Sequence, residues 1–379
     1  MIDVDRLVLE FQTLLSIESP SKKEGKLAHY LADIFEALGY RCFFDKSAEN
    51  TGSEVGNLIV KIPGMIPAPP IFFCAHLDTV GPCENPKIIF ENGVFKTDGR
   101  TILGADDKSG IAILIELARV LRENRFPHPP LEFIFTTCEE IGLLGAKFLD
   151  LELIDAKEGY VLDSENPEVV TIGAPSSYKF KIKVKGKAAH AGLEPEKGVN
   201  AIHVLSKLIA ELNPGRIDQE STMNIGIISG GKYVNIVPET AEAEGEIRSH
   251  NAKTLESMIQ QIEDLCAKVE KGYQPKIDDL PKVSVRFEKL YQAFFIPPDD
   301  PILQPIKQAG EKLGISLSFI KKEGGSDANI FNERGKKAVI LGTGMQKVHT
   351  TEEFIRVKDL VKATQIVVEI VKAKGESFK

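Results

Sequence analysis

The sequence predicts a layered α/β domain with a smaller ferredoxin-like α+β domain inserted into it. Three observations support this prediction. In the first part of the chain, short apolar runs typical of buried strands alternate with helical patterns. From about Ser177 charged and apolar residues alternate, as in a sheet with one face in water. After residues 295–301 the sequence again shows the patterns of buried strands and helices. We therefore expect the large domain at 1–175 and 292–379, and the inserted domain at 176–291.

Buried strands of the large domain are expected where short apolar runs occur, and helices where the apolar residues recur with helical period. The expected strands are 57–62, 71–75, 131–136, 159–163 and 338–342. The expected helices are 109–121 and 357–373, and residues 1–15 read as a further amphipathic helix rather than a signal peptide.

The inserted domain shows the β-α-β-β-α-β order of a ferredoxin-like unit. Its expected elements, in order, are strand 178–186, helix 198–212, strand 222–228, strand 241–249, helix 252–271 and strand 283–290. Charged residues at every second position of the first strand predict that one face of this sheet is exposed.

Composition limits the classes of partner. Of the 379 residues, 42% are hydrophobic, which is enough to form the hydrophobic cores of two domains. The formal net charge is −8. An acidic chain argues against nucleic acid or an anionic membrane as the main partner, and no run is long enough to cross a bilayer. The five cysteines form no CxxC pair, so we expect reduced thiols in a cytoplasmic protein.

Residues of the metal-ligand type follow the carboxyl ends of the predicted strands, where ligands bind in open α/β sheets. These residues are His76, Asp78, Glu139, Glu140, Asp163 and His349, and the loop "GADDKSG" adds Asp106 and Asp107. Two imidazoles with several carboxylates and no thiolate suit Zn²⁺, or Mn²⁺ or Co²⁺ in its place, better than a cysteine-rich structural zinc site.

Each of these residues has a simpler interpretation when it is taken alone. A histidine at a strand end is usually only hydrogen-bonded, and the pair Glu139–Glu140 could be a solvated helix start. The Asp106 loop could be a helix cap, and His349 could precede a helix capped by Thr350 or Thr351. Several unrelated strands would each have to end in such a residue by chance, so the set as a whole favours a metal site.

Geometry assigns roles within the set. Asp78 lies two residues after His76, so its carboxylate can orient that imidazole. Glu139 and Glu140 are neighbours that point in different directions, so one can bind metal while the other acts as a general base. Five candidate ligands are too many for one open tetrahedral zinc, but they suit two zinc ions that share a bridging carboxylate. The five are His76, Asp106, Glu140, Asp163 and His349.

Six motifs in this order, spread over nearly the whole chain, resemble those of the co-catalytic zinc peptidases and deacylases, which include peptidase T, dipeptidases, acetylornithine deacetylase and glutamate carboxypeptidase. The motifs are "HLDTV", "GADDKSGIA", "EEIG", "AHAG", "GGSDAN" and "HTTEEF". The resemblance implies a three-layer α/β/α catalytic domain with an inserted lid or dimerisation domain, and two zinc ions per subunit. It also implies that His76 and Asp163 hold one metal, that Glu140 and His349 hold the other, that Asp106 bridges them, and that Glu139 is the general base with Asp78 behind His76.

Within that family the sequence looks nearest to peptidase T and its tripeptidase-like relatives. The loop reads "GADDKSG" as in that subgroup, and an aspartate at position 163 accompanies aminopeptidase activity in the family. The expected function is therefore hydrolysis of short peptides by metal-activated water, with release of the N-terminal residue. Two alternatives stay open: an N-acyl amino acid deacylase or carboxypeptidase with the same metals, and a non-catalytic binding relative, against which the intact ligands and Glu139 argue.

Substrate-binding residues are expected in and beside the inserted domain. By resemblance, His190, Asn235 and Arg248 reach the substrate, and Gly325 and Ser326 line the pocket. Chemically, Arg248 can pair with a peptide carboxylate, His190 can donate to an oxyanion and Asn235 can bind a carbonyl. Arg248 could instead be a solvated charge, and Ser326 could simply cap a helix. Relatives use this domain for dimers, so a homodimer is expected, although the charged strand 178–186 could equally keep its edge monomeric.

Overall fold

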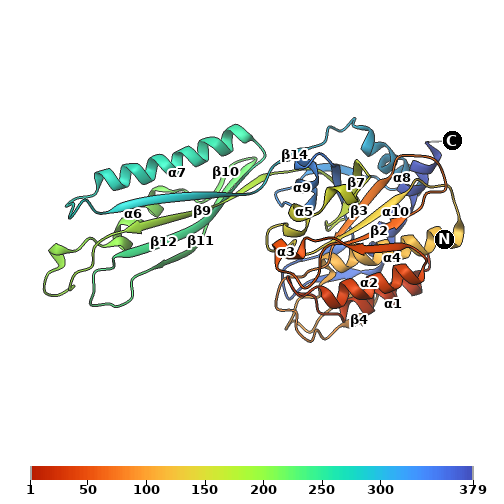
Figure 1. Ribbon diagram of the computed structural model, residues 1–379, viewed down its shortest axis with the longest axis horizontal. Helices are drawn as coiled ribbons and strands as arrows, with labels where there is room; N and C mark the ends of the chain where they lie inside the picture. The colour runs from red at the N-terminus through yellow and green to blue at the C-terminus, as the bar shows by residue number, and fades with distance from the viewer. Residues whose placement is uncertain (1, 378–379) are drawn as a thin grey trace. The chain divides into compact units, whose positions relative to one another are not determined.

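The structure is a computed structural model that describes residues 2–377, and its chain divides into two compact units. The first unit contains Met1–Gly173, Phe295–Lys322 and Ser326–Lys379, and the second contains Ala174–Phe294 and Glu323–Gly325. The second unit is an insertion, because the chain enters it at Ala174 and returns to the first unit at Phe295, and it also includes the three residues Glu323–Gly325 (Figure 1).

The first unit alternates strands and helices along most of its length. Its strands are β1 (Arg41–Phe44), β2 (Leu58–Ile62), β3 (Ile71–His76), β4 (Ile89–Glu91), β5 (Val94–Lys96), β6 (Leu131–Thr136), β7 (Glu158–Leu162), β8 (Val169–Ala174), β14 (Phe294–Phe295, at the unit boundary), β15 (Ser318–Lys321), β16 (Lys337–Leu341), β17 (Met345–Gln346) and β18 (Phe354–Arg356). Its helices are α1 (Val4–Leu15), α2 (Gly25–Ala37), α3 (Ala48–Thr51), α4 (Ala105–Asn124), α5 (Leu144–Phe148), α8 (Gln304–Leu313), α9 (Asp327–Glu333) and α10 (Val357–Glu376).

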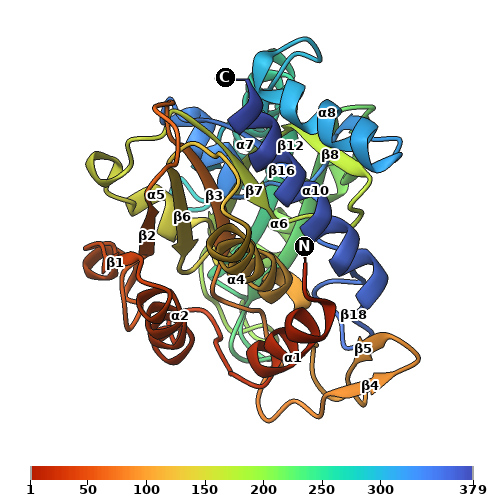
Figure 2. The same ribbon diagram turned by 90° about the vertical axis from the view of Figure 1, so that its right-hand side faces the viewer.

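The main sheet runs in the order β1-β2-β6-β3-β7-β16-β8-β14, and β15 pairs with β8. Its centre is parallel, because β3 pairs in parallel with β6 and β7, and β16 pairs in parallel with β7. The carboxyl ends of β3, β6, β7 and β16 therefore lie along one edge of the sheet (Figure 2).

Helices cover both faces of this sheet. Neighbouring residues of a strand point to opposite faces, and the ring of Phe72 on β3 contacts Phe331 of α9 with centroids 4.7 Å apart. On the other face, Phe73 meets Phe133 of β6, which meets Phe35 of α2. All five aromatic side chains are buried, so the three layers share a continuous apolar core.

A small four-stranded sheet, in the order β17-β18-β5-β4, lies apart from the main sheet. Its strands β17 and β18 form an antiparallel pair in which Gln346 faces Phe354. The segment that joins them, residues 347–353, contains the "HTTEE" motif. This sheet was not predicted, because strands of two or three residues are too short to show a period.

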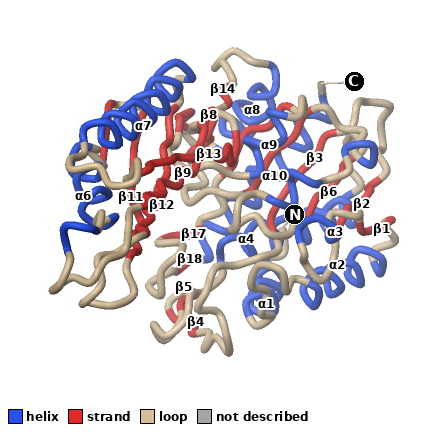
Figure 3. The backbone as a smooth tube through the Cα atoms, turned by 60° about the vertical axis from the view of Figure 1, so that its left-hand side comes forward, coloured by secondary structure: helices blue, strands red, loops and turns tan. Residues whose placement is uncertain are grey.

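The second unit has an antiparallel sheet in the order β10-β11-β12-β9-β13, covered on one face by two helices (Figure 3). Its strands are β9 (Ser176–Lys185), β10 (Gly215–Asp218), β11 (Ser221–Gly230), β12 (Thr240–Ser249) and β13 (Lys282–Tyr291), and its helices are α6 (Ala201–Glu211) and α7 (Ala252–Gly272). Ile182 and Val184 of β9 pack into its core, whereas Lys181 and Lys183 pair with Glu242 on the exposed face.

The predicted fold class is confirmed: a mixed α/β unit carries an inserted ferredoxin-like unit. The one strand added to the expected β-α-β-β-α-β order is the short β10. Within residues 2–377, none of the helices is long and apolar enough to cross a membrane.

Candidate metal centre and catalytic site

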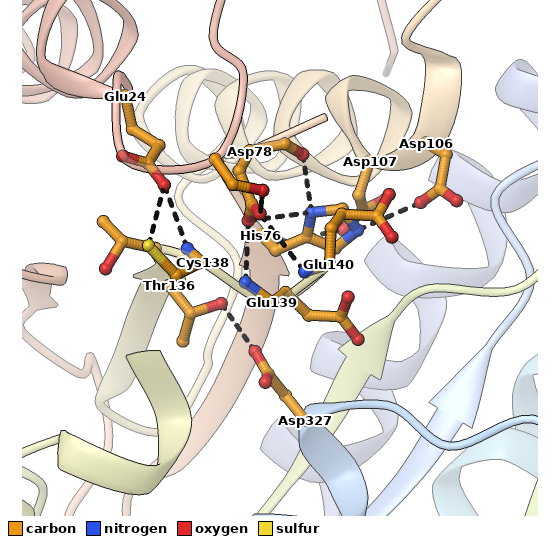
Figure 4. Close-up of polar contacts among 12 residues, drawn as sticks. Glu24, His76, Asp78, Asp106, Asp107, Thr136, Cys138, Glu139, Glu140 and Asp327 are labelled. Carbon is orange, nitrogen blue, oxygen red and sulfur yellow. Dashed lines mark hydrogen bonds and ion pairs between the residues drawn. The ribbon is translucent and has the colours of Figure 1, made fainter. Parts of the chain in front are cut away.

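The edge formed by the carboxyl ends of the parallel strands carries the candidate ligands. His76 is the last residue of β3, Glu139 and Glu140 follow the end of β6 by three and four residues, and Asp163 directly follows β7. His349 comes from the β17–β18 connection. Because β3 and β6 are parallel neighbours, their ends bring His76, Glu139 and Glu140 to one place (Figure 4). Asp163 follows β7, which pairs in parallel with β3.

Asp106 lies between the two imidazoles. Its Oδ1 lies 3.0 Å from Nε2 of His76, and its Oδ2 lies 3.2 Å from Nε2 of His349. Nε2 of His349 also lies 3.0 Å from Oε2 of Glu140. One ligand atom each from His76, Asp106 and Glu140 lie within 4.8 Å of one another. A carboxylate with one oxygen toward each histidine has the geometry of a bridging ligand.

Both ring nitrogens of His76 have an oxygen partner. Its Nδ1 lies 2.8 Å from the backbone carbonyl oxygen of Asp78, which accepts a hydrogen bond only if Nδ1 carries the proton. Nε2 lies 3.0 Å from Oδ1 of Asp106, so in the absence of metal it donates a hydrogen bond to that carboxylate, and contacts with Asp106 and Asp78 raise the pKa of His76. Because Nδ1 is held as a donor to Asp78, Nε2 is the nitrogen that would lose its proton when a metal binds.

The carboxylate of Asp78 lies beside His76 and also has a second role. Its Oδ1 lies 3.6 Å from Nδ1 of His76, within ion-pair range, and helps to raise the pKa of that histidine. Oδ1 also accepts the backbone N–H of Glu139 at 2.9 Å, and Oδ2 accepts the N–H of Glu140 at 3.2 Å and the hydroxyl of Ser21 at 2.6 Å. Asp78 therefore orients His76 through its main chain and fixes the Glu139–Glu140 segment through its side chain.

The pKa values of groups in the cluster are shifted, because several buried acids lie close together. Burial and the charge of Asp106 raise the pKa of Asp163 to about 7, and burial raises the pKa of Glu139 well above its usual range. Contacts with Asp106 and Glu140 raise the pKa of His349 to about 10. These three groups bind protons more strongly than usual, whereas contacts with His349 and His76 lower the pKa of Asp106. A bound cation could replace those protons. The donor set of imidazole nitrogens and carboxylate oxygens fits zinc, manganese or cobalt.

Several known proteins are similar to this chain over nearly its whole length. Residues 172–274 match the peptidase dimerisation domain M20_dimer, and residues 57–159 match peptidase family M28. The crystal structure of aminopeptidase PepT from Bacillus cereus shares 38% identity and a TM-score of 0.89, over 98% of this chain and 99% of that one. A tripeptidase structure from Staphylococcus aureus shares 34% identity and a TM-score of 0.93, over 99% and 100%. The chain belongs to the M20 family of metallopeptidases. The protein YqjE of Bacillus subtilis, whose name states no activity, is 38% identical over 98% of this chain and 99% of its own.

Three expected substrate residues of this M20 chain lie in the inserted unit. His190 pairs with Ile236 across an isolated bridge, and the backbone oxygen of Asn235 accepts the N–H of Ala191 at 3.0 Å, so the segments of His190 and Asn235 lie side by side. Nδ1 of His190 accepts two backbone N–H groups, which leaves Nε2 as its free donor.

Arg248 stands on β12 with part of its guanidinium uncommitted. Its Nη2 contacts Glu246 at 3.1 Å and its Nη1 contacts the carbonyl of Glu323 at 3.4 Å. Its buried Nε has no hydrogen-bond partner among the described residues. Arg248 thus pairs with Glu246, in line with its simpler interpretation as a solvated charge, and its Nε–H is still available to a ligand.

Gly325 and Ser326 have structural tasks of their own. A Cβ at Gly325 would lie 2.3 Å from the ring of Tyr291, so only glycine fits there. The Ser326 hydroxyl accepts the N–H of Ala328 at the start of α9, in a capping box with Asn329. The hydroxyl of Ser326 is therefore committed to capping, as the simpler interpretation expected.

Sequence reasoning missed Glu353, which holds the loop of Asp106. Its Oε2 accepts the N–H groups of Leu103 and Gly104 at 2.8 and 2.7 Å, and its Oε1 accepts the N–H of Asp106 at 3.0 Å. Glu353 is 1% exposed, and burial raises its pKa to about 7. The second acid of "HTTEE" was visible in the sequence, but nothing in its spacing pointed to a loop almost 250 residues away.

Proposed function

We propose that this protein is a zinc-dependent aminopeptidase that removes the N-terminal residue of short peptides, tripeptides above all. The single observation that carries the proposal is the position of Asp106 between His76 and His349, beside the Glu139–Glu140 pair. Two structures that are similar over nearly the whole chain are named aminopeptidase PepT and a tripeptidase, which favours this substrate class over N-acylated ones.

The proposed centre holds two zinc ions, for which Co²⁺ or Mn²⁺ could substitute. His76 and Asp163 would hold one ion, Glu140 and His349 the other, and Asp106 would bridge them. Bound zinc supplies Lewis acidity, which polarises the scissile carbonyl and lowers the pKa of water. The contacts of Asp106 with both histidines support this division of ligands.

Glu139 acts as the general base in this proposal. It takes the proton of the attacking water and later delivers it to the leaving amine. Glu139 is buried and precedes the proposed ligand Glu140 in the chain, and its backbone N–H donates to Asp78. A carboxylate whose pKa is raised by burial binds a proton firmly enough to carry it from one step to the next.

Substrate recognition is assigned to the inserted unit. Arg248 would pair with the carboxylate of the peptide, which limits substrates to short peptides, and its unpartnered Nε supports this role. The free Nε2 of His190 would donate to the oxyanion, and Asn235 would bind a substrate carbonyl. Gly325 and Ser326 would line the pocket with their backbone.

The same proposal includes a homodimer formed through the inserted unit, and a cytoplasmic location. Residues 172–274 match a peptidase dimerisation domain, and Ile227 and Ile228 of β11 are each 60% exposed. Exposed isoleucines on a strand near a sheet edge are suited to pairing with a second copy. The five cysteines are free, as expected in a reducing compartment.

The test is mass spectrometry of products after zinc-loaded protein meets a mixture of free tripeptides, their N-acetylated forms and N-acyl amino acids. We expect loss of the free tripeptides alone, with release of the N-terminal residue. Glu139→Gln prepared in parallel controls for contaminating peptidases, since it should keep its metal and lose turnover by a factor of about 10² to 10⁴. Cleavage of only the blocked substrates would make the protein a deacylase or carboxypeptidase.

A further inference from the structure

Glu24 is a buried acid that lies outside the ligand set, yet it contacts the catalytic segment. It stands at the start of α2 and is 0% exposed. Its Oε1 accepts the backbone N–H of Cys138 at 3.0 Å and contacts the Cys138 thiol at 3.4 Å. The same oxygen accepts the N–H of Lys22 at 2.9 Å, and Oε2 accepts the hydroxyl of Ser53. Figure 4 shows Glu24 beside Cys138.

Cys138 is the residue at which the chain turns from β6 toward Glu139. Its φ of +54° lies in the left-handed region, which residues with a Cβ rarely adopt. Such a conformation persists only where surrounding contacts hold it. Lys22 has a φ of +75°, so one carboxylate oxygen of Glu24 holds two left-handed residues from two segments.

The contact of Glu24 belongs to an unbroken series of anchors. The N–H groups of four consecutive residues each donate to a side-chain oxygen: Thr137 to Asn57 at 3.0 Å, Cys138 to Glu24 at 3.0 Å, Glu139 to Asp78 at 2.9 Å and Glu140 to Asp78 at 3.2 Å. Hydrogen bonds to carboxylates are among the stronger ones in proteins. The main chain that carries Glu139 is thus fixed at every amide, and Glu24 holds the strained position.

We propose that Glu24 is a positioning residue for Glu139: it fixes the left-handed turn at Cys138 from which Glu139 projects. This inference rests on the proposed function, in which Glu139 is the general base. Glu24 touches neither substrate nor the candidate ligands, so it acts only through the direction that it gives to Glu139.

The chain offers a matched control in Glu132, at the other end of the same strand β6. Glu132 is 2% exposed and also accepts two backbone N–H groups, those of Asp155 and Ala156, at 3.0 and 2.9 Å. Replacing either glutamate by methionine removes a buried acid of the same size and leaves two amides without an acceptor. Only one of the two anchored segments carries Glu139.

The experiment compares kcat and KM for a free tripeptide, zinc content and thermal unfolding in E24M, E24Q and E132M. We expect E24M to lower kcat about 10- to 100-fold, as for supporting partners of metal-site residues, with unchanged KM and zinc content. E24Q should regain most of this loss, because its amide oxygen can replace Oε1 and its NH₂ can donate to the Ser53 hydroxyl. E132M should lower the unfolding temperature and leave kcat unchanged.

Two further measurements separate positioning from general damage. In the E139Q background, adding E24M should lower kcat little further, because the effects of residues that act through one another are not additive. By hydrogen exchange, E24M should speed exchange in residues 137–144, and E132M in residues 154–157. Four results would each overturn the role of Glu24. They are wild-type kcat in E24M, an equal loss of kcat when E24M is added to E139Q, loss of zinc from E24M, and unchanged hydrogen exchange at residues 137–144.

Failure of the proposed function gives a different result. If wild-type protein cleaves no tripeptide, or if E139Q is fully active, the proposed function is wrong, while hydrogen exchange still decides whether Glu24 holds the turn. If E24M does not fold, E24D replaces it. The shorter acid keeps the charge but cannot reach Cys138 as well, so slower turnover and faster exchange at 137–144 are expected, and wild-type values for both would reject the proposal.

Discussion

The backbone N–H of Glu139 donates to Oδ1 of Asp78 at 2.9 Å. The same aspartate accepts the ring N–H of His76 through its backbone oxygen. One residue therefore sets the direction of a candidate ligand and of the candidate general base, and any disturbance of Asp78 reaches both.

Asp78→Asn should lower kcat about 10- to 100-fold, as for other supporting partners at metal sites. An asparagine has one acceptor oxygen, so its NH₂ group must face the N–H of either Glu139 or Glu140. Steady-state kinetics on a free tripeptide measure the loss. Asp150→Asn is the control, because Asp150 also accepts a backbone N–H, that of Glu152, but on the surface. Equal kcat values for the two variants would contradict the role of Asp78.

Glu353→Gln should weaken zinc binding about 10- to 100-fold. The glutamine NH₂ would face at least one of the three amides that Glu353 accepts, so the loop of Asp106 would shift. Titration against a competing chelator measures the affinity. The neighbouring Glu352→Gln is the control, since Glu352 pairs with Lys347 at the surface, with 72% of its side chain exposed. If both variants bind zinc as tightly as wild type, Glu353 does not hold the ligand loop.

Zinc binding should release protons and should weaken as the pH falls. The pKa of His349 is raised to about 10 and that of Asp163 to about 7, so at pH 7.5 the metal-free site holds a proton on His349 and a fraction of one on Asp163. Metal needs the lone pairs of both groups. Calorimetry in buffers of different ionisation enthalpy should count at least one proton released, and about one fewer in His349→Gln. No buffer dependence would refute the expectation.

Arg248→Ala should raise KM for tripeptides with a free carboxylate about 10- to 100-fold, which corresponds to roughly 1.5–3 kcal/mol for hydrogen bonds to a charged group. KM for the same peptides with an amidated C-terminus should change little. Arg286→Ala is the control, since Arg286 is exposed on β13 of the same sheet. An equal rise of KM for both kinds of peptide would show that Arg248 does not read the carboxylate.

Periodicity predicts the fold well where elements are long and packed. The apolar run at 131–136 and the alternating charges at 178–186 reflect burial on both faces and on one face, and they became β6 and β9. Strands such as β17, with two residues, leave no such trace. Their existence depends on partners that come from distant parts of the chain.

The proximity of His76 and Glu140 could be predicted because each lies at or just after the end of a strand, and these two strands are parallel neighbours. Asp106 could be singled out only by its motif, because it lies at the start of α4. The supporting acids could not. Glu24 and Glu353 accept backbone N–H groups 114 and 247 residues away. Nearly every residue has such a group, so the sequence does not show which one a buried acid will contact. For Asp78 the neighbour was predicted, but which of its oxygens faces His76 depends on the local turn.

The place of β16 in the main sheet has a consequence for synthesis of the protein. This strand, Lys337–Leu341, lies between β7 and β8, which are made more than 160 residues earlier. Because synthesis runs from the N-terminus and domains fold as units, the inserted unit can fold while the catalytic sheet still lacks a central strand. His349 leaves the ribosome later still. On the proposed ligand set, a nascent chain is therefore inert as a peptidase until both β16 and His349 have emerged.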